Sequence, residues 1–149
     1  YKVIFPMIRD QQIQMQAANS PLDEWVRVST EAPSPMGGIA GDHIQPRHLF
    51  SSASARQRHD PAAWDTAING QVFAALRPDD PIRVPATILQ ADPDLGPAFM
   101  AEHEDRLAAS SPEVRVVRYE GASHLIHAGI AHADRFLDEL DRFVTAHAR

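Results

Sequence analysis

The chain has 149 residues, of which 44% are hydrophobic and 23% are charged, so its composition is that of a globular domain rather than a disordered or fibrous protein. Its formal net charge of −6 disfavours binding to nucleic-acid phosphates or anionic lipid, so we expect no nucleic-acid partner and no membrane partner. There is no cysteine, which excludes disulfides, thiolate nucleophiles and cysteine metal sites.

This sequence shows neither the pattern of a membrane-spanning helix nor that of a secretory signal. No apolar run approaches the roughly 18 residues of a membrane-spanning helix, and the amino terminus lacks the order of basic, apolar and small residues of a secretory signal. We therefore expect a cytoplasmic protein. The chain starts at Tyr1 rather than at a methionine, and we expect that further sequence precedes it.

Residues 1–80 are expected to form a mostly helical segment. The apolar periodicity of residues 1–20 is too weak to assign an element. Pro21 and the acidic residues after it are typical of the first turn of a short helix, because proline is tolerated at the first helical position and acids suit the helix dipole. Leu22, Trp25 and Val26 would share one face of that helix.

The rest of this segment begins with a loop. Residues 31–41 are rich in proline and glycine, which indicates a loop or a hinge, and residues 42–59 carry few strong helix signals. Asp60 and Pro61 combine an N-cap residue with a proline at the first helical position. They predict a helix over residues 61–69.

Residues 81–149 alternate between strand and helix patterns. The sequence predicts a strand over 86–91, a helix from Pro97 to about residue 110, a strand over 114–119 and a closing amphipathic helix. The apolar stripe of the last helix consists of Phe136, Leu137, Leu140, Phe143 and Val144. This alternation indicates an α/β fold with a mostly parallel sheet. Two strands alone would leave bare edges, so the chain resembles the end of a larger fold.

The candidate catalytic residues directly follow the two predicted strands. Asp92 and Asp94 follow the first strand, and His124 follows the second, with Gly121 permitting a tight turn between strand and histidine. Carboxyl ends of parallel strands meet at one edge of a sheet, and a histidine that a carboxylate orients can act as a general base. Taken alone, however, a Gly-x-x-His more often contains a structural or exposed histidine.

Together these residues resemble the α/β-hydrolase family over residues 82–147. The stretch 85–94 is similar to the family's seventh strand and acid loop, and residues 121–124 are similar to its histidine loop. The resemblance implies the carboxyl-terminal portion of an α/β-hydrolase fold, with His124 as the base and Asp94 as the acid that holds the imidazole. Asp92 is the alternative acid, or it caps the helix that follows.

The resemblance also implies a helical cap before the seventh strand, within the segment 1–80. Its aromatic and apolar side chains would then line a pocket for an acyl or hydrocarbon-like small molecule. The candidate lining residues are Trp25, Met36, Phe50, Trp64 and His127. The simpler and more common interpretation is that the cap residues are core residues, and a solvated role explains His127 equally well. No cofactor is implied, and the spacing of His43, His48 and His59 matches no metal-ligand motif.

One part of the family pattern is absent. The nucleophile of α/β-hydrolases lies in Gly-x-Ser-x-Gly, whereas the only similar spacing here places Ile39 between Gly37 and Gly41. We therefore predict that this chain is inactive alone and that the nucleophile, serine or aspartate, lies on the amino-terminal half of the same fold, in a missing segment or a partner chain. The implied reaction is hydrolysis of an ester, thioester, lactone or related small molecule. The alternative is a non-catalytic binding or assembly domain derived from the same fold.

Overall fold

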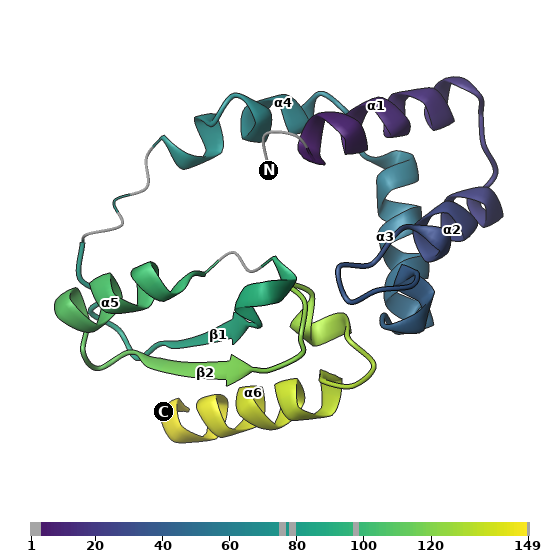
Figure 1. Cartoon of the computed structure of the whole chain (residues 1–149). Helices are drawn as coiled ribbons and strands as arrows, with labels where there is room; N and C mark the ends of the chain where they lie inside the picture. Colours follow the sequence, from purple (N-terminus) through teal and green to yellow (C-terminus); the bar gives the residue numbers. More distant parts are fainter. Residues whose placement is uncertain (1–3, 75–76, 78–79, 97–98, 149) are drawn as a thin grey trace. The chain divides into compact units, whose positions relative to one another are not determined.

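The chain folds into two compact units. The computed structural model describes residues 4–74, 77, 80–96 and 99–148 (Figure 1). One unit comprises residues 1–32 and 46–77, and the other comprises residues 33–45 and 78–149. Sequence patterns divide the chain once, near residue 80, whereas the structure assigns the loop 33–45 to the carboxyl-terminal unit.

The amino-terminal unit is helical in its described part. Its elements are α1 (Ile4–Ala17), α2 (Leu22–Glu31), α3 (Pro46–Arg58), α4 (Ala63–Ile68) and a 3₁₀ turn at Gln71–Phe73. The helix predicted over 61–69 and the helix after Pro21 are confirmed. The helices α1 and α3 have no counterpart among the elements that the sequence predicts.

The core of this unit is small and centred on Trp25. Trp25 is only 1% exposed and packs with Met15 and Ala53, and Leu22 and Val26 add to the cluster. The indole Nε1 of Trp25 donates a hydrogen bond of 3.1 Å to the carbonyl of Ser20, so burial leaves its polar atom satisfied. The predicted shared face of this helix is therefore confirmed.

A buried glutamine explains why α1 gives a weak apolar pattern. Gln12 is fully buried, and its amide donates to the carbonyls of Arg56 at 3.0 Å and His59 at 2.8 Å. Its Oε1 accepts a hydrogen bond of 2.9 Å from the indole of Trp64. A polar side chain that is fully hydrogen-bonded occupies a place where helical periodicity demands an apolar one.

The carboxyl-terminal unit contains the predicted strand–helix–strand–helix series. The strands β1 (Thr87–Ala91) and β2 (Arg115–Tyr119) pair in parallel, with Leu89 opposite Val117. The helix α5 (Ala101–Ser110) joins them, and α6 (Ala133–His147) closes the chain. The predicted start of α5 at Pro97 lies outside the described residues, and the described helix begins at Ala101 after an extended Met100.

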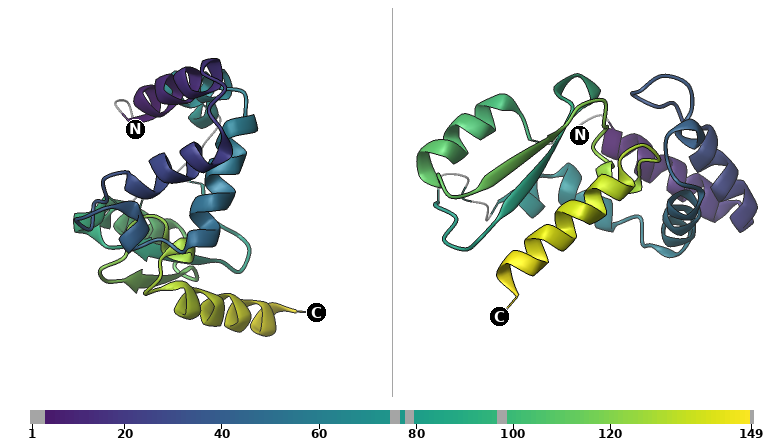
Figure 2. Two further views of the ribbon diagram at one scale, coloured as in Figure 1. Left: turned by 90° about the vertical axis from the view of Figure 1, so that its right-hand side faces the viewer. Right: turned by 90° about the horizontal axis from the view of Figure 1, so that it is seen from below.

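The two faces of the sheet contact different helices (Figure 2). Leu89, Ala91, Val117 and Tyr119 lie on the face that α6 covers, where Phe136 packs against them. On the opposite face, Arg118 donates to Gln90 Oε1 at 3.0 Å and pairs with Glu104 of α5 at 2.6 Å. The sheet is thus sandwiched between the two helices of its own unit.

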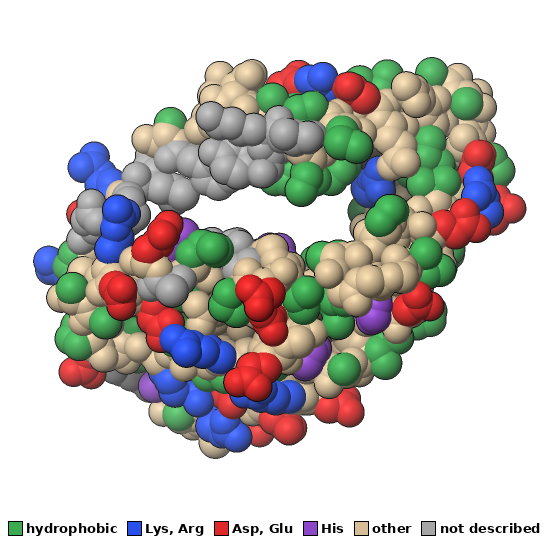
Figure 3. All heavy atoms as spheres, in the orientation of Figure 1, with side chains coloured by type: hydrophobic (Ala, Val, Ile, Leu, Met, Phe, Trp, Pro, Cys, Tyr) green, Lys and Arg blue, Asp and Glu red, His purple; other side chains and the backbone are tan. Residues whose placement is uncertain are grey.

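Polar contacts anchor α6 to the second strand. Glu139 is paired with Arg115 and Arg142, and the Tyr119 hydroxyl donates to the carbonyl of Arg135 at 3.2 Å. Acidic and basic side chains interleave on the face of this unit that Figure 3 shows. The apolar stripe of α6 is nevertheless only partly covered, because Leu137 and Leu140 remain 52% and 48% exposed.

The architecture is mixed helix and sheet with a two-stranded parallel sheet, which is compatible with the predicted α/β class. None of the helices in the described ranges combines the length and the apolar character that a membrane crossing requires.

Candidate functional site

The loops after β1 and β2 are joined directly at the carboxyl edge of the sheet. The Asp92 N–H donates to the carbonyl of Ala122 at 2.9 Å, and the Gly121 N–H donates to Asp92 Oδ2 at 2.7 Å. Gly121 has a φ of +70°, a left-handed conformation that suits glycine, so the tight turn predicted there is confirmed. The acid loop and the histidine loop therefore form one structural unit.

Asp92 uses both carboxylate oxygens to hold this unit together. Its Oδ1 accepts from the Asp94 N–H at 3.0 Å, while its Oδ2 accepts from Gly121. These bonds stabilise the charged form, so the pKa of Asp92 lies below its usual range, with the Gly121 bond the larger cause. Asp92 caps the 3₁₀ turn Pro93–Leu95 and not the helix that follows, whose N-cap residue is Met100.

Asp94 has a different environment. Its side chain is exposed, and its carboxylate has no hydrogen-bond partner among the residues that the structure describes. Between the two candidate acids, Asp92 is already bound to backbone amides and Asp94 keeps its carboxylate available. Neither carboxylate is hydrogen-bonded to His124 in the described structure.

His124 lies at the rim of an apolar hollow of about 190 Å³. The hollow is lined by Leu89, Ala91, Phe99, His124, Ile126, His127 and Phe136. His124 and His127 are both exposed, and the His127 ring lies 5.9 Å from the Phe136 ring, centroid to centroid. An imidazole at the edge of an apolar concavity can move a proton to or from a group bound there.

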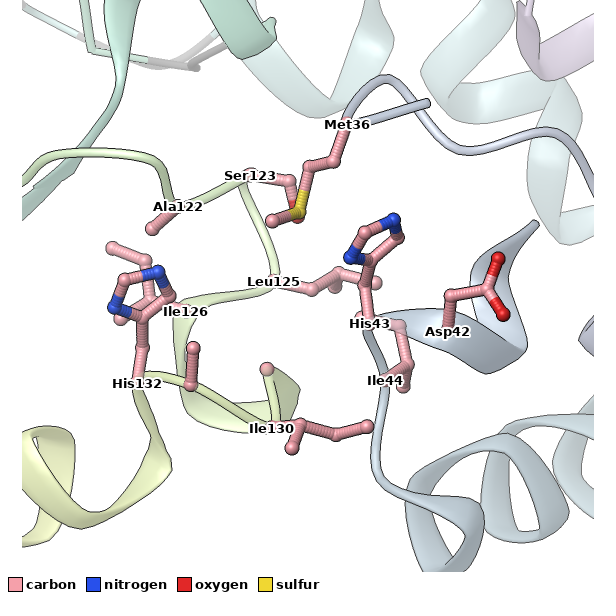
Figure 4. Close-up of a pocket in the computed structure, with 12 residues that line it drawn as sticks. Met36, Asp42, His43, Ile44, Ala122, Ser123, Leu125, Ile126, Ile130 and His132 are labelled. Carbon is pink, nitrogen blue, oxygen red and sulfur yellow. The ribbon is translucent and has the colours of Figure 1, made fainter. Parts of the chain in front are cut away.

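A second hollow lies between the histidine loop and the loop 33–45 (Figure 4). The loop 33–45 forms one wall, held by a hydrogen bond of 2.8 Å from the Ile130 N–H to the His43 carbonyl and one of 2.9 Å from the Gln45 N–H to the Ala128 carbonyl. Its volume is about 120 Å³, and Met36 and Ser123 both line it. The sequence does not predict this packing, because a Pro- and Gly-rich loop gives no signal for its tertiary partner.

The predicted substrate-lining residues fall in different places. Trp25 belongs to the core of the amino-terminal unit, which is the simpler of the interpretations offered for it. Trp64 packs its ring 5.4 Å from Phe5, and Phe50 is 53% exposed. Met36 lines the hollow of Figure 4, and His127 lines the hollow that contains His124.

Phe99, Ile126 and Phe136 are lining residues that sequence reasoning does not assign to the site. Phe136 is visible in the sequence only as part of the stripe of α6, and nothing in its spacing distinguishes a pocket wall from a core residue. Across the described ranges, His, Asp and Glu side chains form no group of three or more that could hold a metal ion.

Comparisons with known proteins add no relatives: no protein-family model, curated protein or solved structure matches this chain. The resemblance to α/β-hydrolases therefore rests on the motif residues of the sequence alone.

Proposed function

We propose that this chain is the carboxyl-terminal portion of an α/β-hydrolase fold and that it supplies the histidine and the acid of a hydrolytic site. The observation that carries the proposal is the joining of the acid loop and the histidine loop at one edge of a parallel strand pair, with His124 at the rim of an apolar hollow. The carboxyl edge of a parallel sheet is where such folds place their chemistry.

In this proposal His124 is the general base and Asp94 is the acid that orients it. Asp92 instead positions the histidine loop, because its two oxygens already accept backbone hydrogen bonds. Catalytic hydrogen bonds are often long or unformed before substrate binds, so the exposed Asp94 and His124 are compatible with a pair that forms in the complex.

The nucleophile comes from outside this chain, on the amino-terminal half of the same fold or on a partner chain. His124 takes the proton of a serine hydroxyl as that oxygen attacks the substrate carbonyl, and it returns the proton to the leaving alcohol or thiol. In the second half-reaction His124 deprotonates the water that attacks the acyl group and returns that proton to the serine oxygen as the acid is released. An aspartate nucleophile would make His124 the base for that water alone.

The hollow beside His124 suits the apolar part of a small molecule. Leu89, Phe99 and Phe136 form its walls, and such surfaces bind acyl or hydrocarbon groups through burial. We therefore propose an ester, thioester, lactone or related bond as the target.

The test requires the nucleophile-bearing polypeptide. The tagged chain is purified from its own cells with whatever binds it, and hydrolysis of short-chain p-nitrophenyl esters is measured for the complex and for the chain alone. We expect activity in the complex only, and a loss of about 10²–10⁴-fold on His124→Ala, the range typical of a general base. His147→Ala, at the far end of α6, is the matched control and leaves the rate unchanged. A complex that hydrolyses the ester equally well with His124→Ala contradicts the assignment.

A non-catalytic binding or assembly domain is the second candidate. Two observations favour it: in the described structure His124 donates no hydrogen bond to either carboxylate, and both oxygens of Asp92 already accept from backbone amides. It predicts that no preparation of the chain acquires His124-dependent hydrolysis.

A further inference from the structure

The two edges of the sheet differ in a way that points to a docking surface. The Arg115 N–H donates to the Ala86 carbonyl at 3.2 Å, and in the parallel register this directs the N–H and C=O groups of Thr87, Leu89 and Ala91 away from β2. In the described part of the chain these outward groups have no hydrogen-bond partner.

Charge protects the edge of β2 but not that of β1. Arg115 and Arg118 lie on β2 and are paired with Glu139 and Glu104. The β1 sequence, Thr-Ile-Leu-Gln-Ala, has no charged residue. Charged side chains on an edge strand discourage pairing with another strand, so β1 is the edge at which a further strand can add.

The free edge of β1 is also complementary to itself. Pro85 and Pro93 flank Leu89 at equal distances along the chain, and neither has an N–H to donate. The outward N–H groups are thereby limited to a set that is symmetric about Leu89. In an antiparallel pair, Thr87 of each copy would lie opposite Ala91 of the other copy, and the two Leu89 residues would lie opposite each other. This register gives about six hydrogen bonds.

The charges at the ends of β1 favour the antiparallel orientation. Arg83 precedes the strand, and Asp92 and Asp94 follow it. Antiparallel pairing brings the basic end of one copy beside the acidic end of the other, whereas parallel pairing would place like charges together.

The apolar surface next to this edge would be covered at the same time. A hollow of about 130 Å³ is lined by Thr87, Leu89, Phe136, Glu139, Leu140 and Phe143. A two-fold axis perpendicular to the sheet keeps α6 of both copies on one face, which would place the second copy beside this hollow and beside the exposed Leu140.

We propose that β1 pairs antiparallel with β1 of a second copy of this chain, about a two-fold axis at Leu89. The result is a continuous sheet in the order β2–β1–β1–β2, with the charged β2 strands at both outer edges. This dimer goes with the second candidate function, an assembly domain, because it occupies the edge of β1 at which the amino-terminal half of the proposed hydrolase would join the sheet. A strand from the nucleophile-bearing segment is the competing occupant of the same edge.

Cysteine placement tests the register, because the natural chain has no cysteine. Leu89→Cys, Thr87→Cys and Val116→Cys are treated with the shortest bis-methanethiosulfonate linker and resolved by denaturing electrophoresis. Opposite residues of a hydrogen-bonded antiparallel pair are about 5.5 Å apart, so we expect a covalent dimer for Leu89→Cys. The Thr87 pair is offset by four residues along the strands, about 13 Å, so Thr87→Cys and Val116→Cys stay monomeric. Equal cross-linking of Thr87→Cys overturns the register.

Proline placement tests the edge without cysteine. Thr87→Pro removes an outward N–H of β1, and Val116→Pro removes an outward N–H of β2, so the two variants are matched perturbations of opposite edges. By light scattering on folded protein, we expect Thr87→Pro to raise the dimer dissociation constant at least about tenfold and Val116→Pro to leave it unchanged. If the chain without substitutions stays monomeric up to its solubility limit, the proposal is overturned. A different polypeptide that co-purifies with the Leu89→Cys variant and blocks modification of its thiol also overturns it, because another strand then occupies this edge.

Discussion

Asp92 shows how a side chain that resembles a catalytic acid can act on the backbone instead. Its carboxylate accepts from the Gly121 N–H and the Asp94 N–H, one from each of the loops that it connects. Asp94, two residues later, lacks such contacts in the described part of the chain. Adjacent carboxylates in one loop therefore differ in role because only one of them faces backbone amides.

The Asp92 contacts predict an acid-dependent stability. Because the pKa of Asp92 is lowered in the folded state, its contribution is complete above the unfolded value of about 3.9 and is lost as the pH falls through the folded pKa. Asp92→Asn should flatten the pH dependence of the free energy of unfolding in this acid range, measured by urea denaturation at several pH values. Asp94→Asn is the matched control. An equal effect of both substitutions would contradict the stabilising role of the hydrogen bonds that Asp92 accepts from Gly121 and Asp94.

Gly121 gives a second prediction at the scale of one residue. A Cβ added there would meet nothing within 4 Å, so the only obstacle to alanine is the φ of +70°. The left-handed conformation costs a non-glycine residue about 1–2 kcal/mol, and we expect Gly121→Ala to lower the free energy of unfolding by that amount. Denaturant titration measures it, and no change would mean that the turn adopts another conformation.

At the scale of elements, α1 and α3 depend on tertiary contacts rather than on their own patterns. Gln12 of α1 binds the carbonyls of Arg56 and His59, at the carboxyl end of α3 and just beyond it, and thereby satisfies acceptors that the helix end leaves open. Helices of this length gain most of their stability from packing.

Substitution of Trp25 tests whether this residue is central to the packing of the amino-terminal unit. Truncation of a buried tryptophan costs about 3–5 kcal/mol, so Trp25→Ala should unfold the amino-terminal unit at a much lower urea concentration. Phe50→Ala, at a site 53% exposed, should change the free energy of unfolding by no more than about 0.5 kcal/mol. Similar effects of both substitutions, followed by tryptophan fluorescence of Trp64 and by circular dichroism, would contradict the assigned core.

At the scale of the whole molecule, the carboxyl-terminal unit does not bury all of its own apolar residues. In the described ranges its sheet has two strands, and the stripe of α6 keeps Leu137, Leu140 and Val144 about half exposed. The two proposals answer this condition in different ways: either another segment that carries the nucleophile completes the sheet at the free edge of β1, or a second copy of the chain does.

Local sequence patterns were enough to predict the strand–helix–strand–helix order of residues 87–147 and the loops that carry Asp92, Asp94 and His124, because alternation, proline and glycine act on their near neighbours. They also indicated the turn at Gly121, whereas Asp92 caps a 3₁₀ turn and not the helix that the sequence predicts after it. Three features emerged only in the folded chain: Asp92 binds Gly121, the loop 33–45 packs on the histidine loop, and Gln12 of α1 binds the end of α3. Those contacts join residues far apart in the chain, and hydrogen bonds between distant backbone and side-chain groups leave no periodic trace in the sequence.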